Sequence, residues 1–84
     1  MRTKTVLVNT GDGLDARGVA LCVQQASTFE SKIHLTDGVR RMNAKSLMGM
    51  MALGIALGDE VEIETDGPDE EEALEAMASF FGEG

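Results

Sequence analysis

The sequence has few of the residues that cross-link a small domain or bind a cofactor. Among its 84 residues are one cysteine, one histidine, one proline, and no tryptophan or tyrosine. Because Cys22 has no second cysteine to pair with, an internal disulfide and a cysteine-based zinc cluster are both excluded. We therefore expect a cytoplasmic protein with no metal and no cofactor, stabilised by an apolar core near the lower size limit for one domain.

Basic residues are scarce as well. Seven Lys and Arg residues stand against 15 Asp and Glu residues, which gives a formal net charge of -8 and a pI near 4.4. Nucleic acids and anionic membranes attract basic surfaces, so this composition argues against direct binding to either. No stretch approaches the ~18 apolar residues of a membrane span, and the first residues alternate instead of forming an export signal. We expect a soluble protein that acts through protein partners.

The spacing of apolar residues predicts one domain, residues 1–84, with seven elements. Polar and apolar residues alternate in four segments, as in half-buried strands, and apolar residues recur at helical spacing in three others. The dipeptide Asp37-Gly38 between two strand-like segments indicates a β-hairpin. The predicted strands cover residues 3–8, 31–35, 39–42 and 60–65, and the predicted helices cover residues 16–29, 46–53 and 69–81.

This element order is βαββαβα. Each element has one apolar side, and packing three helices on one face of a four-stranded antiparallel sheet buries all of these sides. The predicted fold class is therefore α+β, an open-faced β-sandwich. The acidic run at residues 69–72 resembles an acidic tail, but it begins the last helix, where the helix dipole stabilises carboxylates. We interpret it as a helix start.

Two short motifs resemble those of one family. Residues 13–18 read Gly-Leu-Asp-Ala-Arg-Gly, and residues 43–49 read Asn-Ala-Lys-Ser-Leu-Met-Gly. Together they resemble HPr, the small phosphocarrier of the bacterial sugar phosphotransferase system. Its active loop reads Gly-Leu-His-Ala-Arg-Pro, and its regulatory serine lies in an Asn-Ala-Lys-Ser-like run. The resemblance extends over nearly the whole chain and implies the HPr-like fold.

Ser46 has two interpretations. At the N-cap of the second predicted helix, its hydroxyl would accept a hydrogen bond from an amide of the first turn, which alone explains a serine there. A phosphate on Ser46 would be stabilised by the same unpaired amides and by the helix dipole. The resemblance implies the second role, with Ser46 as a regulatory phosphorylation site and a substrate of HPr kinase/phosphorylase.

The first motif departs from the family, because Asp15 occupies the phosphohistidine position and Gly18 replaces the proline. A carboxylate forms no phosphoramidate, although it can form an acyl phosphate, usually with help from a divalent cation. Asp15 is also a good N-cap, with Asp12 adding favourable charge, and it could pair with Arg17. Loss of the histidine with retention of the serine resembles the Crh-type catabolite repression subclass. We therefore expect no catalytic residue and no enzyme activity.

The second predicted helix also indicates a binding surface. Helical spacing directs Met50 and Leu53 to the core and leaves other apolar residues outside. Exposed apolar residues usually mark a binding face, although methionine also serves as pliable core filling. In the family, the surface beside the serine and the start of the first helix contacts Enzyme I, the kinase and the catabolite control regulator. The matching positions are Ala16, Arg17, Ala20, Gln24, Leu47, Met48 and Met51.

Two further residues have chemistry that the motifs do not use. His34 lies between Ile33 and Leu35, so strand alternation directs it to the opposite, outer side. We interpret it as a surface histidine and not as a phosphoryl acceptor. Cys22 falls on the apolar side of the first helix and is expected to be a core residue, not a nucleophile.

Three functions fit this sequence. The first is a regulatory protein of carbon catabolite control, phosphorylated on Ser46 and bound by a LacI-type transcriptional regulator. The second is a sugar phosphotransferase phosphocarrier that takes phosphate from Enzyme I on Asp15. The third is an unmodified binding module that regulates a metabolic enzyme by contact. The lost histidine together with the retained serine favours the first.

Overall fold

The computed structural model describes residues 1–9 and 15–82, which contain four strands and three helices in the predicted order. The strands are β1 (Arg2–Leu7), β2 (Lys32–Asp37), β3 (Arg40–Asn43) and β4 (Glu60–Asp66). The helices are α1 (Ala16–Ala26), α2 (Leu47–Leu53) and α3 (Glu70–Phe80).

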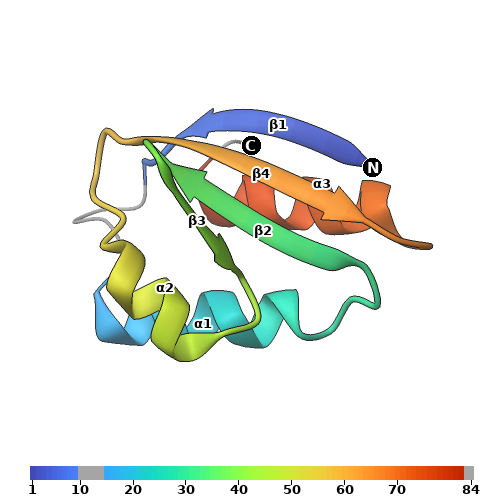
Figure 1. The fold of residues 1–84 in the computed structure, drawn as a ribbon, viewed down its shortest axis with the longest axis horizontal. Coiled ribbons are helices and arrows are strands. Elements are labelled where there is room, and N and C mark those ends of the chain that lie inside the picture. Colours follow the sequence, from blue (N-terminus) through green and yellow to red (C-terminus); the bar gives the residue numbers. More distant parts are fainter. Residues whose placement is uncertain (10–14, 83–84) are drawn as a thin grey trace.

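The strands form one antiparallel sheet in the order β1-β4-β2-β3, and the helices cover one face of it (Figure 1). Helix α3 packs on β1 and β4, α2 packs on β3, and α1 packs between the two helices. The predicted α+β open-faced sandwich is therefore confirmed. The two edge strands of the sheet are β1 and the short strand β3.

Strand β4 shows why one face of the sheet is covered and the other is open. Its side chains alternate, so that Val61, Ile63 and Thr65 are buried beneath the helices. The outward positions of the same strand are all acidic: Glu60, Glu62, Glu64 and Asp66. The apolar core that results includes Val6, Val19, Cys22, Ile33, Leu35, Met50, Val61, Ile63, Met77 and Phe81.

The largest error in the predicted bounds is at the end of α1. The helix was expected to reach residue 29 but ends at Ala26. The amides of Thr28 and Phe29 bond instead to the carbonyls of Gln25 and Ala26, at 3.2 and 3.3 Å, which tightens the chain into a turn. Phe29 still packs against the core, which explains why its apolar side chain extended the helical pattern.

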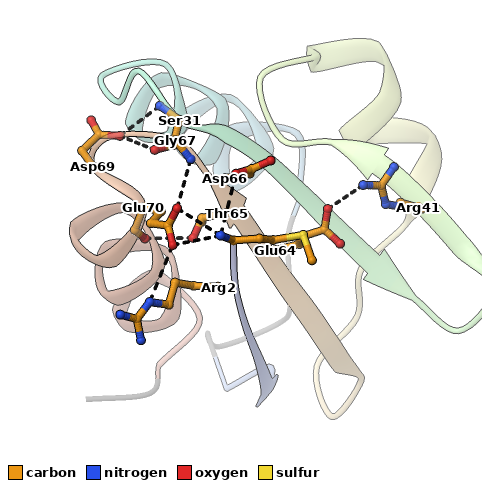
Figure 2. A network of polar contacts seen from close by, with 10 residues as sticks. Arg2, Ser31, Arg41, Glu64, Thr65, Asp66, Gly67, Asp69 and Glu70 are labelled. Carbon is orange, nitrogen blue, oxygen red and sulfur yellow. Dashed lines mark hydrogen bonds and ion pairs between the residues drawn. The ribbon is translucent and has the colours of Figure 1, made fainter.

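The acidic run at residues 69–72 begins α3, as interpreted from the sequence, with Asp69 at the N-cap position. Glu70, Glu71 and Glu72 do form its acidic first turn, but the Asp69 side chain makes no cap hydrogen bond. Its carboxylate accepts instead from the backbone amide of Glu30, at 3.0 Å. It also accepts from the backbone amide of Ser31, at 2.9 Å, and from the Ser31 hydroxyl (Figure 2). Asp69 therefore connects the β4–α3 turn to the α1–β2 turn.

Within residues 1–9 and 15–82, no helix is long and apolar enough to span a membrane.

Candidate functional site

Helices α1 and α2 pack side by side beneath the β2–β3 half of the sheet and run in opposite directions (Figure 1). The start of α2 therefore lies beside the end of α1, where the Lys45 ammonium donates to the Phe29 carbonyl. All seven residues of the predicted partner-binding surface are exposed, and we call them the docking surface. They are Ala16, Arg17, Ala20, Gln24, Leu47, Met48 and Met51.

Asp15 is the N-cap of α1. It has extended backbone angles, and its carboxylate accepts a hydrogen bond of 2.8 Å from the Gly18 amide. Its carbonyl accepts the first helical hydrogen bond, from Val19, at 2.9 Å. This contact satisfies an amide that would otherwise lack a partner at the helix start, so the capping role expected of Asp15 is present.

The expected ion pair between Asp15 and Arg17 does not form. Both residues belong to the described part of the chain and both are exposed, yet no contact joins their charged groups. Residues two apart at a helix start point in different directions, and the Asp15 carboxylate is already bound by Gly18. Arg17 therefore presents its charge at the docking surface. Asp12, expected to add negative charge here, lies outside the described residues.

Ser46 is the N-cap of α2. Its half-buried hydroxyl accepts a hydrogen bond of 3.2 Å from the Gly49 amide, and its carbonyl accepts from Met50 at 2.9 Å. The predicted N-cap position is thus correct. The α2 first turn has no acidic residue, in contrast to the first turn of α3. A negative group on Ser46 would therefore meet no carboxylate from its own helix.

Two residues ahead of Ser46 position it, and sequence reasoning gave them no role. Asn43 accepts from the Lys45 amide through its side chain, at 2.9 Å, and from the Ser46 amide through its carbonyl, at 3.0 Å. The Lys45 ammonium donates to the Phe29 carbonyl at 2.7 Å. The preference of asparagine for turns was the available signal for Asn43, whereas nothing local predicts the contact of Lys45 with Phe29.

The other end of α2 is fixed by a residue from β3. Gly54 ends the helix in the left-handed conformation, with φ of 64°. The Arg40 guanidinium donates to the carbonyls of Ala52 and Leu53, at 2.8 and 3.3 Å, which gives α2 a cation at the negative end of its dipole. The short helix is thus held at both ends.

The two sides of α2 are as predicted. Met50 and Leu53 are buried, whereas 47% of Leu47, 84% of Met48 and 53% of Met51 are exposed. Sequence reasoning missed Leu21 of α1, which is exposed on the same side of its helix as Arg17, four residues earlier. Its helical spacing was the signal that could have identified it.

Neither the cysteine nor the histidine contributes to this site. Cys22 is fully buried in the core, and burial raises its pKa to about 12, so it remains a thiol. His34 lies on the open face of the sheet, opposite Asn43 and Glu64 of the neighbouring strands. In the described residues, no group of three or more His, Cys, Asp or Glu side chains could hold a metal ion.

Comparison with known proteins gives the family. The family described as the PTS HPr component phosphorylation site matches residues 2–83. Phosphocarrier protein HPr of Treponema pallidum (strain Nichols) is 48% identical over 81 residues, covering 96% of this chain and 92% of that protein. HPr-like protein Crh of Bacillus subtilis (strain 168) is 42% identical over 83 residues, covering 99% and 98%.

The fold agrees with a solved relative. The crystal structure of HPr-C-His from Thermoanaerobacter tengcongensis matches with a TM-score of 0.92 and 40% identity, covering 98% of this chain and 92% of that one. Identity is similar to HPr and to Crh, so it does not by itself distinguish a carrier from a regulator. These matches show that the chain belongs to the HPr family, as a Crh-like member in which Asp15 occupies the position of the carrier histidine.

Proposed function

We propose that the protein is a regulator of carbon catabolite control that HPr kinase/phosphorylase phosphorylates on Ser46 and a LacI-type transcriptional regulator then binds. On this proposal it acts by binding, without catalysis of its own and without histidine phosphocarrier activity. The main support is the placement of Ser46 at a helix N-cap, directly beside the exposed apolar residues Leu47 and Met48.

A phosphate on Ser46 would alter this surface without rebuilding the fold. It adds about -1.5 to -2 units of charge and three acceptor oxygens, next to a helix start that offers amides and no carboxylate. The core side of α2, with Met50 and Leu53, is not involved. Partners that offer arginine or lysine at this place would gain charge-assisted hydrogen bonds, and acidic partners would be repelled.

Asp15 argues against the carrier function. Its carboxylate is engaged by the Gly18 amide, and no metal-binding cluster of acidic groups surrounds it among the described residues. An acyl phosphate at Asp15 would also give up this cap. The carrier remains the second candidate, because the chain is similar both to an HPr phosphocarrier, at 48% identity, and to a Crh protein, at 42%.

The test separates the candidate functions by the phosphate donor. The purified protein is incubated with ATP and HPr kinase/phosphorylase, and separately with phosphoenolpyruvate and Enzyme I. Intact-mass and fragment analysis then locates any phosphate. Ser46→Ala removes the first acceptor, and Asp15→Asn removes the second while leaving an amide oxygen to cap α1.

Acid-stable phosphate on Ser46 from ATP alone is expected, together with binding of the phosphorylated form to the transcriptional regulator. Hydroxylamine-sensitive phosphate on Asp15 from phosphoenolpyruvate would establish the carrier instead. If neither donor modifies the protein, the function is that of an unmodified module that binds a metabolic enzyme.

A further inference from the structure

The cysteine and the methionines of this protein differ widely in exposure. Cys22 is fully buried, and its raised pKa of about 12 keeps it in the unreactive thiol form. The methionines Met50 and Met77 are buried, with 1% and 0% exposed, and Met42 packs against the core. The exposed methionine residues are Met1, Met48 and Met51, with 70%, 84% and 53% exposed, and Met42 is intermediate.

Two of these exposed methionines belong to the docking surface. Met48 and Met51 are three residues apart on α2, so they are neighbours on the outer side of the helix. With Leu47 they form the apolar part of the docking surface beside Ser46. A water-soluble oxidant therefore reaches sulfur at the surface where a partner would bind, but not the sulfur of the core.

We propose that Met48 and Met51 form a reversible, peroxide-sensitive modification site that controls the docking surface. Its regulatory consequence rests on the proposed function, whereas the modification itself does not. A methionine sulfur attacks one oxygen of hydrogen peroxide, the O–O bond breaks, and an S–O bond forms. The second oxygen leaves as hydroxide and takes the proton from the oxygen now bound to sulfur, which gives water. The thioether is thus oxidised to a sulfoxide and the peroxide is reduced.

The sulfoxide changes the surface because it replaces a pliable apolar group with a polar one. Partner binding through apolar contact is weakened by such a change. Oxidation is expected to leave the fold intact, because the core side of α2 is formed by Met50 and Leu53. Both ends of α2 are also fixed by hydrogen bonds, at Ser46 and from Arg40. Methionine sulfoxide reductases would reach the exposed sulfoxides and restore the thioethers.

The first arm of the test measures the chemistry without any partner. The protein is treated with hydrogen peroxide, and fragment mass analysis follows each methionine over time while circular dichroism follows folding. Met48 and Met51 are expected to oxidise at least about tenfold faster than Met50 and Met77, with the fold retained, and to be repaired by reductases A and B. Equal rates at surface and core methionines, or oxidation that unfolds the chain, would overturn the proposal.

The second arm measures the consequence at Ser46. Untreated, oxidised and repaired samples are compared as substrates of HPr kinase/phosphorylase, each variant against its own untreated sample. Oxidation is expected to slow phosphorylation about fivefold or more, and repair to restore it. The matched control is the double variant Met48→Leu and Met51→Leu, which keeps Met1 oxidisable and conserves side-chain volume in α2.

The two arms fail separately. An untreated protein that the kinase does not phosphorylate contradicts the proposed function, and the first arm then decides the modification site alone. An oxidised protein that is phosphorylated as fast as the untreated one contradicts regulation by oxidation. The same conclusion follows if peroxide slows phosphorylation of the double leucine variant as much, since the effect would then arise from Met1, Met42 or the core.

Discussion

Asp15 and Gly18 form the same contact at the start of α1 that Ser46 and Gly49 form at the start of α2. In each pair, the N-cap oxygen accepts from the amide three residues later, at 2.8 Å in α1 and 3.2 Å in α2. The position of the missing histidine is thus filled by a residue with a structural task. An aspartate at this position needs no phosphoryl chemistry to explain it.

The cap at Asp15 can be tested by removing its acceptor. Asp15→Ala is expected to lower the free energy of unfolding by about 1 kcal/mol, whereas Asp15→Asn, which keeps an acceptor oxygen, should cost much less. Urea denaturation measures both. Arg17→Ala is the control and should change stability little, since Arg17 makes no ion pair with Asp15. A large loss in the Arg17 variant would show that the two charges do interact.

The assignment of the α2 sides predicts very different costs for two adjacent methionines. Met50→Ala removes a buried side chain and should destabilise the protein by about 2–5 kcal/mol. Met51→Ala trims an exposed one and should change the free energy of unfolding by no more than about 0.5 kcal/mol. Denaturant titration measures the free energy of unfolding of both variants. Similar losses of this free energy would mean that Met51 belongs to the core.

Asp69 is expected to make the free energy of unfolding depend on pH in the acidic range. Hydrogen bonds from the Ser31 hydroxyl and the Glu30 amide hold the pKa of its carboxyl below the ordinary value. A pKa lower in the folded than in the unfolded state gives stability that is present above pH ~4 and lost as the pH falls further. The Tm values of Asp69→Asn and the parent should therefore differ most near pH 6, and the difference should shrink as the pH falls below ~4. A constant difference would rule out the charge as the cause.

Asp37 should show the opposite dependence. Burial and the neighbouring Asp59 carboxyl raise its pKa, so its charged form weakens the folded state. The penalty is absent at low pH and appears as the pH rises through the unfolded and then the folded pKa. Asp37→Asn is expected to be more stable than the parent at pH 7, by ~2–4 °C in Tm, with the gain gone below pH ~4.

Asp59→Asn is the contrasting variant. The Asp59 carboxylate accepts from the Ala56 amide at 3.0 Å, and this bond is the main reason that its pKa is lowered. Its replacement should lower the Tm at pH 7 instead of raising it. If both variants shifted the Tm in the same direction, the two carboxyls would not differ as described.

Gly67 is required by a close approach of two turns. A side chain at Gly67 would place its Cβ 2.6 Å from the Ser31 Cα. Gly67→Ala should therefore cost more than about 2 kcal/mol in urea denaturation. Gly38→Ala is the matched control, because Gly38 also has positive φ, 67°, but nothing lies within 4 Å of the added Cβ. Equal costs would mean that backbone strain alone, and not the contact with Ser31, is responsible.

Much of the fold could be predicted because its signals are local. Alternation in β4 and the helical spacing of Met50 and Leu53 correctly separated core from surface. The N-cap positions of Asp15 and Ser46 followed from the residue types that start helices. The element order and the exposed side of α2 could both be predicted without knowing which distant residues are in contact.

The contacts that the sequence did not predict are those in which a side chain bonds to a distant part of the chain. Asp69 was interpreted from its neighbours as part of a helix start, and it does occupy the N-cap position of α3. Its side chain, however, bonds to Ser31 and Glu30, which lie 38 and 39 residues earlier. Arg40 fixes the end of α2 across 12 or 13 residues. Such contacts depend on sheet order and strand register, which one sequence does not reveal through its spacing.

The carboxylate at Asp15 also limits the number of charge states that phosphorylation can give the docking surface. A carrier with a phosphorylatable histidine and a phosphorylatable serine has four charge states: neither, either one or both of these residues can be phosphorylated. Two separate enzymes produce these states. On the proposed function the charge of Asp15 stays constant, so phosphorylation of Ser46 would leave two charge states. Partners of this protein would therefore distinguish only two forms, with and without phosphate on Ser46. This choice would not depend on phosphate transfer during sugar uptake.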